Sequence, residues 1–144
     1  MSDETLRWVV GGVLLLHGVA HGGAIGSLWW VGSGRATNAG GWTSARSWLF
    51  PSLATGMATR LAVAFWVASL VGFVLTALAF LGIVLPVDAW PALGVASAAT
   101  STLGIVLFFG TWPMFNTLAA LVVNIAVVIA VLSGWSPEAA RAAA

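Results

Sequence analysis

The apolar run from Trp8 to Val31 contains no charged residue, and its length constrains the fold more than any other feature. A helix needs about 20 such residues to cross the hydrocarbon core of a bilayer. Three further apolar runs follow it along the chain. Backbone polar groups must be satisfied inside lipid, and these runs lack the alternation of barrel strands. We therefore predict transmembrane helices over residues 8–31, 55–85, 91–109 and 112–132.

The composition excludes an ordinary soluble domain and several classes of site. Only 6% of the 144 residues are charged and 60% are hydrophobic, whereas soluble domains contain about 25% charged residues. The chain has no cysteine, so it has neither a disulfide nor a thiolate metal ligand. It contains no basic tract for nucleic acid, no nucleophile–base pair, no phosphate-binding glycine loop and no paired carboxylates. These absences favour a protein that is not an enzyme.

The connections predict the order of the helices. Short turns after residues 85 and 109 make the flanking helices antiparallel. We predict an all-α fold, an up-down four-helix bundle, in one transmembrane domain over residues 1–144 with a long loop at 32–54. All four acids then lie on the side of the two termini, whereas Arg35, Arg46 and Arg60 lie on the other side. Arginine favours the cytoplasmic side, so we expect both termini to face outward.

Two histidines lie near the middle of the first apolar run. His17 and His21 are four residues apart, so they share one face of a helix. Ionisable groups at membrane depth are costly, and they mark functional sites more often than not. Gly18, Gly22 and Gly26 form a second stripe, which would let another helix approach closely. The first helix therefore has one polar face and one packing face.

The last apolar run contains a polar stripe of its own. Asn116, Thr117, Ala120 and Asn124 recur at helical spacing. An asparagine in a membrane helix needs an interhelical hydrogen bond, so we expect this stripe to face the two histidines. We name His17, His21, Asn116 and Asn124 as candidate ligand-binding residues.

Several chemistries are open to such a cluster. Histidine and asparagine can hydrogen-bond the carbonyl or hydroxyl of a quinone or lipid in an apolar pocket. A haem could take one histidine as its axial ligand. A metal ion would need more ligands than His17 and His21 supply, and a proton relay would need an acid at the same depth. Alternatively, the polar groups satisfy one another and only fix the packing of the helices.

Arg60 is the last candidate ligand-binding residue. Every acid lies on the opposite side of the predicted membrane, so Arg60 has no obvious carboxylate partner. It can extend toward lipid phosphates. It can also hold an anion at the mouth of the bundle, below a loop that contains Trp42 and Trp48.

Two short motifs resemble a known group of proteins. The first helix contains His17-Gly18-Val19-Ala20-His21, and the last contains Phe115-Asn116-Thr117-Leu118-Ala119-Ala120-Leu121. Together they are similar to motifs of small bacterial four-helix membrane proteins of the DoxX-like kind. The resemblance implies a four-helix bundle in a bacterial plasma membrane, and it implies no activity and no catalytic residue.

These observations lead to three functional hypotheses. The first is an integral membrane protein whose polar core binds a small hydrophobic or amphipathic ligand such as a quinone, a lipid or a haem. The second is an accessory subunit of a larger membrane complex, with partner membrane subunits and a role in electron transfer. The third is a small transporter or channel that works as a homo-oligomer. If the glycine stripe faces lipid, the second and third are favoured; if it packs within the chain, the first is favoured.

Overall fold

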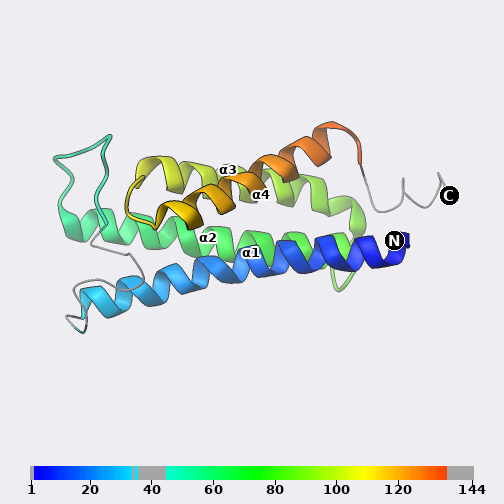
Figure 1. The fold of residues 1–144 in the computed structure, drawn as a ribbon, viewed down its shortest axis with the longest axis horizontal. Coiled ribbons are helices and arrows are strands. Elements are labelled where there is room, and N and C mark those ends of the chain that lie inside the picture. Colours follow the sequence, from blue (N-terminus) through cyan, green and yellow to red (C-terminus); the bar gives the residue numbers. More distant parts are fainter. Residues whose placement is uncertain (1, 34, 36–44, 136–144) are drawn as a thin grey trace.

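The protein folds into four long α-helices that run alternately up and down (Figure 1). The computed structural model describes residues 2–33, 35 and 45–135, and within these residues there is no β-strand. The helices are α1 (Asp3–Gly32), α2 (Thr55–Leu81), α3 (Trp90–Leu107) and α4 (Met114–Leu132), with a short 3-10 helix η1 (Val87–Ala89) before α3. This architecture confirms the predicted all-α four-helix bundle. All four helices are long and apolar enough to cross a membrane, as in an integral membrane protein.

The helix ends differ from the predicted ranges where a capping residue decides them. Helix α1 begins at Asp3 instead of residue 8, because the side chain of Ser2 accepts a hydrogen bond from the backbone N–H of Thr5. Helix α2 ends at Leu81 instead of residue 85, because Gly82 adopts a left-handed conformation with φ of 66°. Apolar composition continues past that glycine, so hydropathy alone carries the predicted helix too far. Helices α3 and α4 differ from their predicted ranges by at most two residues at either end.

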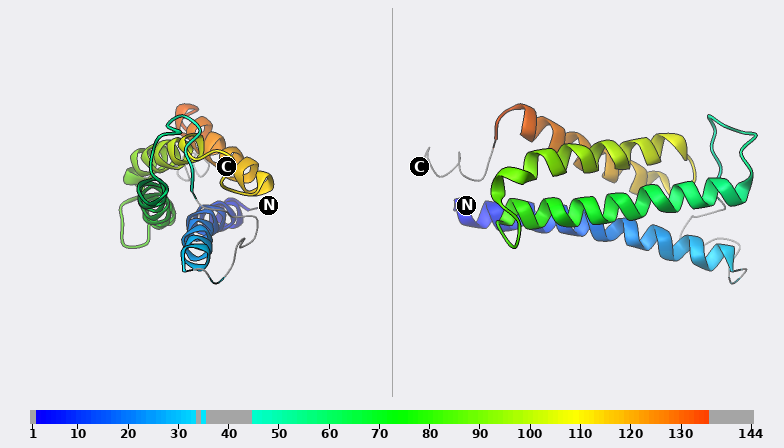
Figure 2. Two further views of the ribbon diagram at one scale, coloured as in Figure 1. Left: turned by 90° about the vertical axis from the view of Figure 1, so that its left-hand side faces the viewer. Right: turned by 180° about the vertical axis from the view of Figure 1, so that it is seen from behind.

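Each helix packs against the next one in the chain, but the first and last helices contact each other much less. Helix α1 lies along α2, α2 lies along α3, and α3 contacts α4, whereas α1 and α4 meet only over a short stretch. The end-on view in Figure 2 shows the four helices in this arrangement. The seam between α1 and α4 is therefore the loosest of the bundle.

Glycines bring α1 close to α2. A Cβ atom at Gly18 would lie 3.1 Å from the Cβ of Phe73 and 3.2 Å from the backbone oxygen of Leu70. A Cβ at Gly22 would lie 3.1 Å from a side-chain carbon of Leu70, whereas one at Gly26 would meet no atom within 4 Å. Two of the three stripe glycines thus pack within the chain, as small residues do between membrane helices.

Two apolar clusters fill the bundle, one toward each end. The cluster near the termini includes Leu14, Phe73 and Phe80, and the other includes Trp66 and Phe108. Three buried polar residues, His21 on α1, Ser101 on α3 and Asn124 on α4, lie between these clusters along their helices. The core therefore consists of two apolar layers with a polar layer between them.

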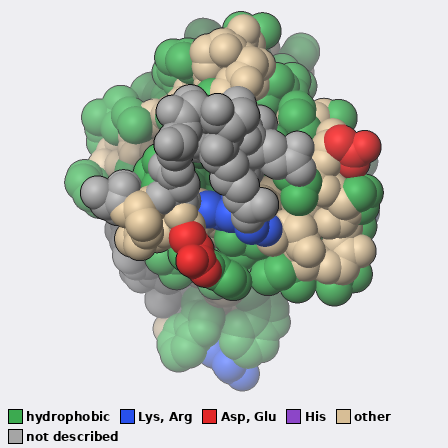
Figure 3. Space-filling model, turned by 90° about the vertical axis from the view of Figure 1, so that its right-hand side faces the viewer, with side chains coloured by type: hydrophobic (Ala, Val, Ile, Leu, Met, Phe, Trp, Pro, Cys, Tyr) green, Lys and Arg blue, Asp and Glu red, His purple; other side chains and the backbone are tan. Residues whose placement is uncertain are grey.

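The end of the bundle with the N-terminus carries charged side chains of both signs (Figure 3). Glu4 and Asp88 are exposed there, and Arg7 donates a hydrogen bond from Nη2 to the backbone oxygen of Leu81. That carbonyl belongs to the last residue of α2, where a cation is favourable to the helix dipole. Glu138, the acid predicted on the same side, lies outside the described residues.

Candidate ligand-binding site

The polar layer joins three helices through one side chain of α4. Asn124 accepts a hydrogen bond at Oδ1 from Nε2 of His17 on α1, with 3.1 Å between the atoms. Its Nδ2 donates to Oγ of Ser101 at 3.0 Å and to Oγ1 of Thr102 at 3.1 Å, both on α3. Ser101 in turn lies 3.3 Å from Nε2 of His21 on α1. Asn124, which is only 2% exposed, thus uses its acceptor and both of its donor hydrogens.

The direction of the hydrogen bond to Asn124 assigns the proton on the ring of His17. An amide oxygen only accepts, so His17 carries its proton on Nε2 and keeps a lone pair on Nδ1. Ser101 accepts from Asn124 and lies 3.3 Å from Nε2 of His21, and the direction of this second contact depends on the tautomer of His21. In the neutral tautomer that accepts from Ser101 at Nε2, His21 carries its proton on Nδ1. This atom is buried and has no hydrogen-bond partner among the described residues.

Aromatic rings surround the two histidines. The ring of Phe73 on α2 lies perpendicular to that of His17, with 4.4 Å between centroids, and it stacks at 6.3 Å with His21. Trp112, in the connection before α4, lies 5.5 Å from His21. The two imidazoles lie 5.1 Å apart. The site therefore has flat apolar walls and a few polar atoms, as small-molecule sites usually do.

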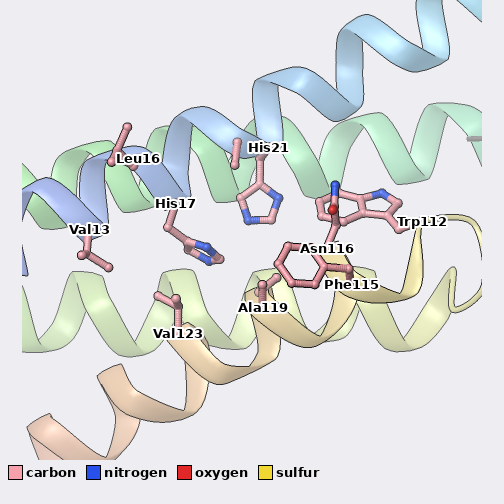
Figure 4. A pocket seen from close by; sticks show the side chains of 11 residues that line it. Val13, Leu16, His17, His21, Trp112, Phe115, Asn116, Ala119 and Val123 are labelled. Atoms are coloured by element: carbon pink, nitrogen blue, oxygen red, sulfur yellow. The ribbon is translucent and has the colours of Figure 1, made fainter. Parts of the chain in front are cut away.

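A cavity of about 390 Å³ lies against the two histidines, in the loose seam between α1 and α4 (Figure 4). It is lined by Val13, Leu16, His17, Ala20 and His21 from α1 and by Trp112, Phe115, Asn116, Ala119, Ala120 and Val123 from residues 112–123. Leu16 is 70% exposed and Phe115 is 81% exposed. The cavity therefore reaches the apolar outer surface of the bundle, which would face lipid.

The structure brings together three of the predicted ligand-binding residues and separates two. His17, His21 and Asn124 belong to one hydrogen-bonded cluster. Asn116 lines the same cavity, but it lies on the exposed side of α4 and forms no described hydrogen bond with the cluster. Arg60 is exposed near the start of α2 and does not line the cavity.

The predicted loop over Arg60 is described only in part. Trp48 donates a hydrogen bond from Nε1 to the backbone oxygen of Val106 on α3, at 2.6 Å. Its contact is thus with α3, although 61% of its surface remains exposed. Trp42 lies outside the described residues.

Three residues of the site were not identified from the sequence. Ser101 and Thr102 supply the acceptors for Asn124, and Phe73 supplies an aromatic wall. One signal for Ser101 was present, because Ser97 and Ser101 are four residues apart and share one face of α3. Phe73 has no such signal, since it is one apolar residue among many on α2.

The donor set does not resemble a metal centre or a haem site. Among the described residues, no group of three or more His, Cys, Asp or Glu side chains could hold a metal ion. Nε2 is engaged in both histidines, by Asn124 and by Ser101. Only the Nδ1 atoms remain as possible ligands of a haem iron. Each Nδ1 lies on the side of the ring next to the Cβ of its residue, where the flat haem has little room.

Comparisons of the chain with protein-family models, with curated proteins and with solved structures find no match. The DoxX-like resemblance therefore stays a prediction.

Proposed function

We propose that this integral membrane protein binds a small amphipathic molecule that carries a carbonyl group and reaches the site from the lipid. The observation that carries the proposal is Nδ1 of His21, which is buried without a partner, on a side chain that lines the cavity. We take His21 in the tautomer that accepts from Ser101 at Nε2 and therefore carries its proton on Nδ1. A buried donor without an acceptor costs about 1–3 kcal/mol, and a hydrogen bond to a ligand carbonyl would recover that free energy.

The position of the cavity supports access from the bilayer. It lies between α1 and α4, and exposed apolar side chains such as Leu16 and Phe115 form its rim. A polar solute would have to cross this rim, whereas an apolar molecule dissolved in the membrane meets it directly. The site therefore suits a lipid-soluble ligand.

The shape and walls of the cavity favour a flat, ring-shaped head such as that of a quinone. A volume of about 390 Å³ lies near the lower end of the usual range of about 300–1,000 Å³ for ligand pockets. Trp112 and Phe115 line the cavity with their rings, and Phe73 packs against the histidines from α2. A quinone carbonyl can accept from Nδ1 of His21, and the hydroxyl of its reduced form can donate to the lone pair on Nδ1 of His17.

The glycine stripe supports a self-contained binder over a subunit or a homo-oligomer. Gly18 and Gly22 both face α2, so the close-packing face of α1 is already used within the chain. We place the protein in a bacterial plasma membrane with both termini outward, as the arginine distribution and the family resemblance suggest.

The test is ligand binding to purified protein in mild detergent, with methyl-substituted benzoquinone as the probe in equilibrium dialysis. We expect saturable binding by the wild type and a loss of about tenfold or more in His21→Phe, which keeps a ring but removes the donor. Thr76→Val is the matched control. Thr76 is also a buried polar residue, but it donates to the backbone oxygen of Gly72 and does not line the cavity.

We expect the control to unfold at a lower temperature and to bind the probe like the wild type. Absence of saturable binding to the wild type contradicts the proposal. Equal loss of binding in Thr76→Val and His21→Phe also contradicts it, because the polar layer would then act only through stability.

A further inference from the structure

A second cavity of about 290 Å³ lies in the same seam, closer to the termini. Its lining is entirely hydrophobic and includes Val10 and Ala126. Val13 and Val123 line both cavities, so the two spaces are neighbours along α1 and α4. The loose seam thus contains two adjacent cavities, one with polar groups in its wall and one with an apolar wall.

Aromatic rings line the far end of this second cavity. Phe80 and Trp135 stack with 5.7 Å between centroids, and Trp90 lies perpendicular to Phe80 at 5.4 Å. All three line the cavity, and Trp90 is only 3% exposed. From Val10 to His21 the two cavities extend along about 16 Å of helix. The two cavities together are therefore long enough for a head and a chain, and aromatic rings line the apolar one.

We propose that the ligand is a single-chain lipid, with its carbonyl head at His21 and its apolar chain in the second cavity. This inference rests on the proposed function and specifies the ligand further. The side chains that line the second cavity carry no polar atom except the indole nitrogens of Trp90 and Trp135. His21 lines the first cavity, and its Nδ1 has no hydrogen-bond partner among the described residues. The head and the chain therefore lie in a defined order along the seam.

The dimensions exclude a protein helix as the occupant. A partner helix packs at about 8–10 Å between axes along its length and has a diameter of about 10–12 Å. A cavity of about 290 Å³ accommodates a few side chains at most. A single apolar chain fills it without moving α1 or α4 apart.

The experiment compares probes that share one benzoquinone head and differ in the chain. The probes carry a methyl, a decyl or a geranyl substituent, and their affinities are measured in the same detergent. We expect the decyl or geranyl probe to bind at least about tenfold more tightly than the methyl probe, because the added carbons are enclosed by the protein. The decyl and geranyl probes distinguish a straight acyl-type chain from a branched isoprenoid chain.

Two alanines provide the matched variants. Ala126 lies on α4 and lines only the second cavity, so Ala126→Phe fills the space for the chain. Ala68 is equally exposed on α2 but lines neither cavity. We expect Ala126→Phe to abolish the advantage of the long-chain probes while the methyl probe binds as before. Ala68→Phe should retain the full advantage.

The outcomes separate this inference from the proposed function. If all three probes bind the wild type equally, or if Ala126→Phe keeps the full advantage of the long chains, the chain lies in detergent or lipid and the inference is overturned. In either case the methyl probe still reports on the head site. If no probe shows saturable binding, both the proposed function and the inference fail.

Discussion

The two sides of α1 differ in how they meet their neighbours. On the side of α2, Gly18 allows the helices to approach until a Cβ would lie 3.2 Å from the backbone oxygen of Leu70. On the side of α4, His17 and His21 line a cavity, and the helices meet only briefly. Lipid tails are as apolar as leucine, so membrane helices associate through close packing and not through exclusion of water. Helix α4 contains no glycine, and its seam with α1 stays open.

The polar side chains differ between seams in the same way. In the close α2–α3 seam, Thr76 and Ser97 donate to backbone oxygens of their own helices, at 2.8 and 2.6 Å. In the open seam, His17 and Asn124 bond between helices. Hydroxyl groups satisfied by their own helix add little to helix association, whereas the amide and imidazole groups hold α1, α3 and α4 together. Close helix packing and the site thus belong to different seams.

The largest effect on stability should come from enlarging a residue in the close seam between α1 and α2. Gly18→Leu would place its side chain against backbone atoms of α2, which cannot move aside as a side chain could. We expect a loss of about 3 kcal/mol in the free energy of unfolding, measured by the unfolding midpoint in mild detergent. Gly26→Leu, where no atom lies within 4 Å, should change it by less than about 0.5 kcal/mol. Equal effects of the two changes would contradict the packing role of Gly18.

A smaller effect is expected from the open seam. Asn124→Leu removes the hydrogen bonds to His17, Ser101 and Thr102. Such bonds contribute about 0.6 kcal/mol each in membrane proteins, so we expect a loss of about 2 kcal/mol. The same change should weaken binding of the methyl-substituted benzoquinone probe, because Ser101 would no longer orient His21.

The comparison for Asn124 is with Asn116, which lines the cavity from the exposed side of α4. Asn116→Leu should leave the unfolding midpoint unchanged within about 0.5 kcal/mol. A stability loss as large as that of Asn124→Leu would show that both asparagines hold the bundle. The distinction between the exposed and the buried asparagine would then be wrong.

The smallest effect on stability is expected at the end of the α1–α2 seam that lies near the N-terminus. Arg7→Met removes the donor to the backbone oxygen of Leu81 and should cost about 1 kcal/mol. Arg60→Met is the matched control, because Arg60 is exposed near the opposite end of the bundle. The Arg60→Met substitution should leave the unfolding midpoint unchanged. If it weakens binding of an anionic probe such as decanoate, the anion-anchor hypothesis for Arg60 gains support.

Part of the site was predictable from the sequence. The four-residue spacing of His17 and His21, together with Asn124 on a second helix, predicted a polar cluster at membrane depth. The roles of Ser101 and Thr102 required the structure, because hydroxyl groups in membrane helices more often bond to their own backbone, as Ser97 does. Nothing in the apolar sequence indicated that Phe73 faces the histidines.

The sequence by itself determined the number, approximate limits and alternating direction of the helices. The thickness of a bilayer and the need to satisfy every backbone polar group leave few alternatives for long apolar runs with short turns. The tertiary structure alone decided how each helix is rotated about its axis. In a soluble bundle the polar face turns to water, but here both the lipid and the interior are apolar, so hydropathy does not orient a helix. Side-chain packing therefore decided that Asn124 is buried while Asn116 is exposed, and that the seam between α1 and α4 stays open.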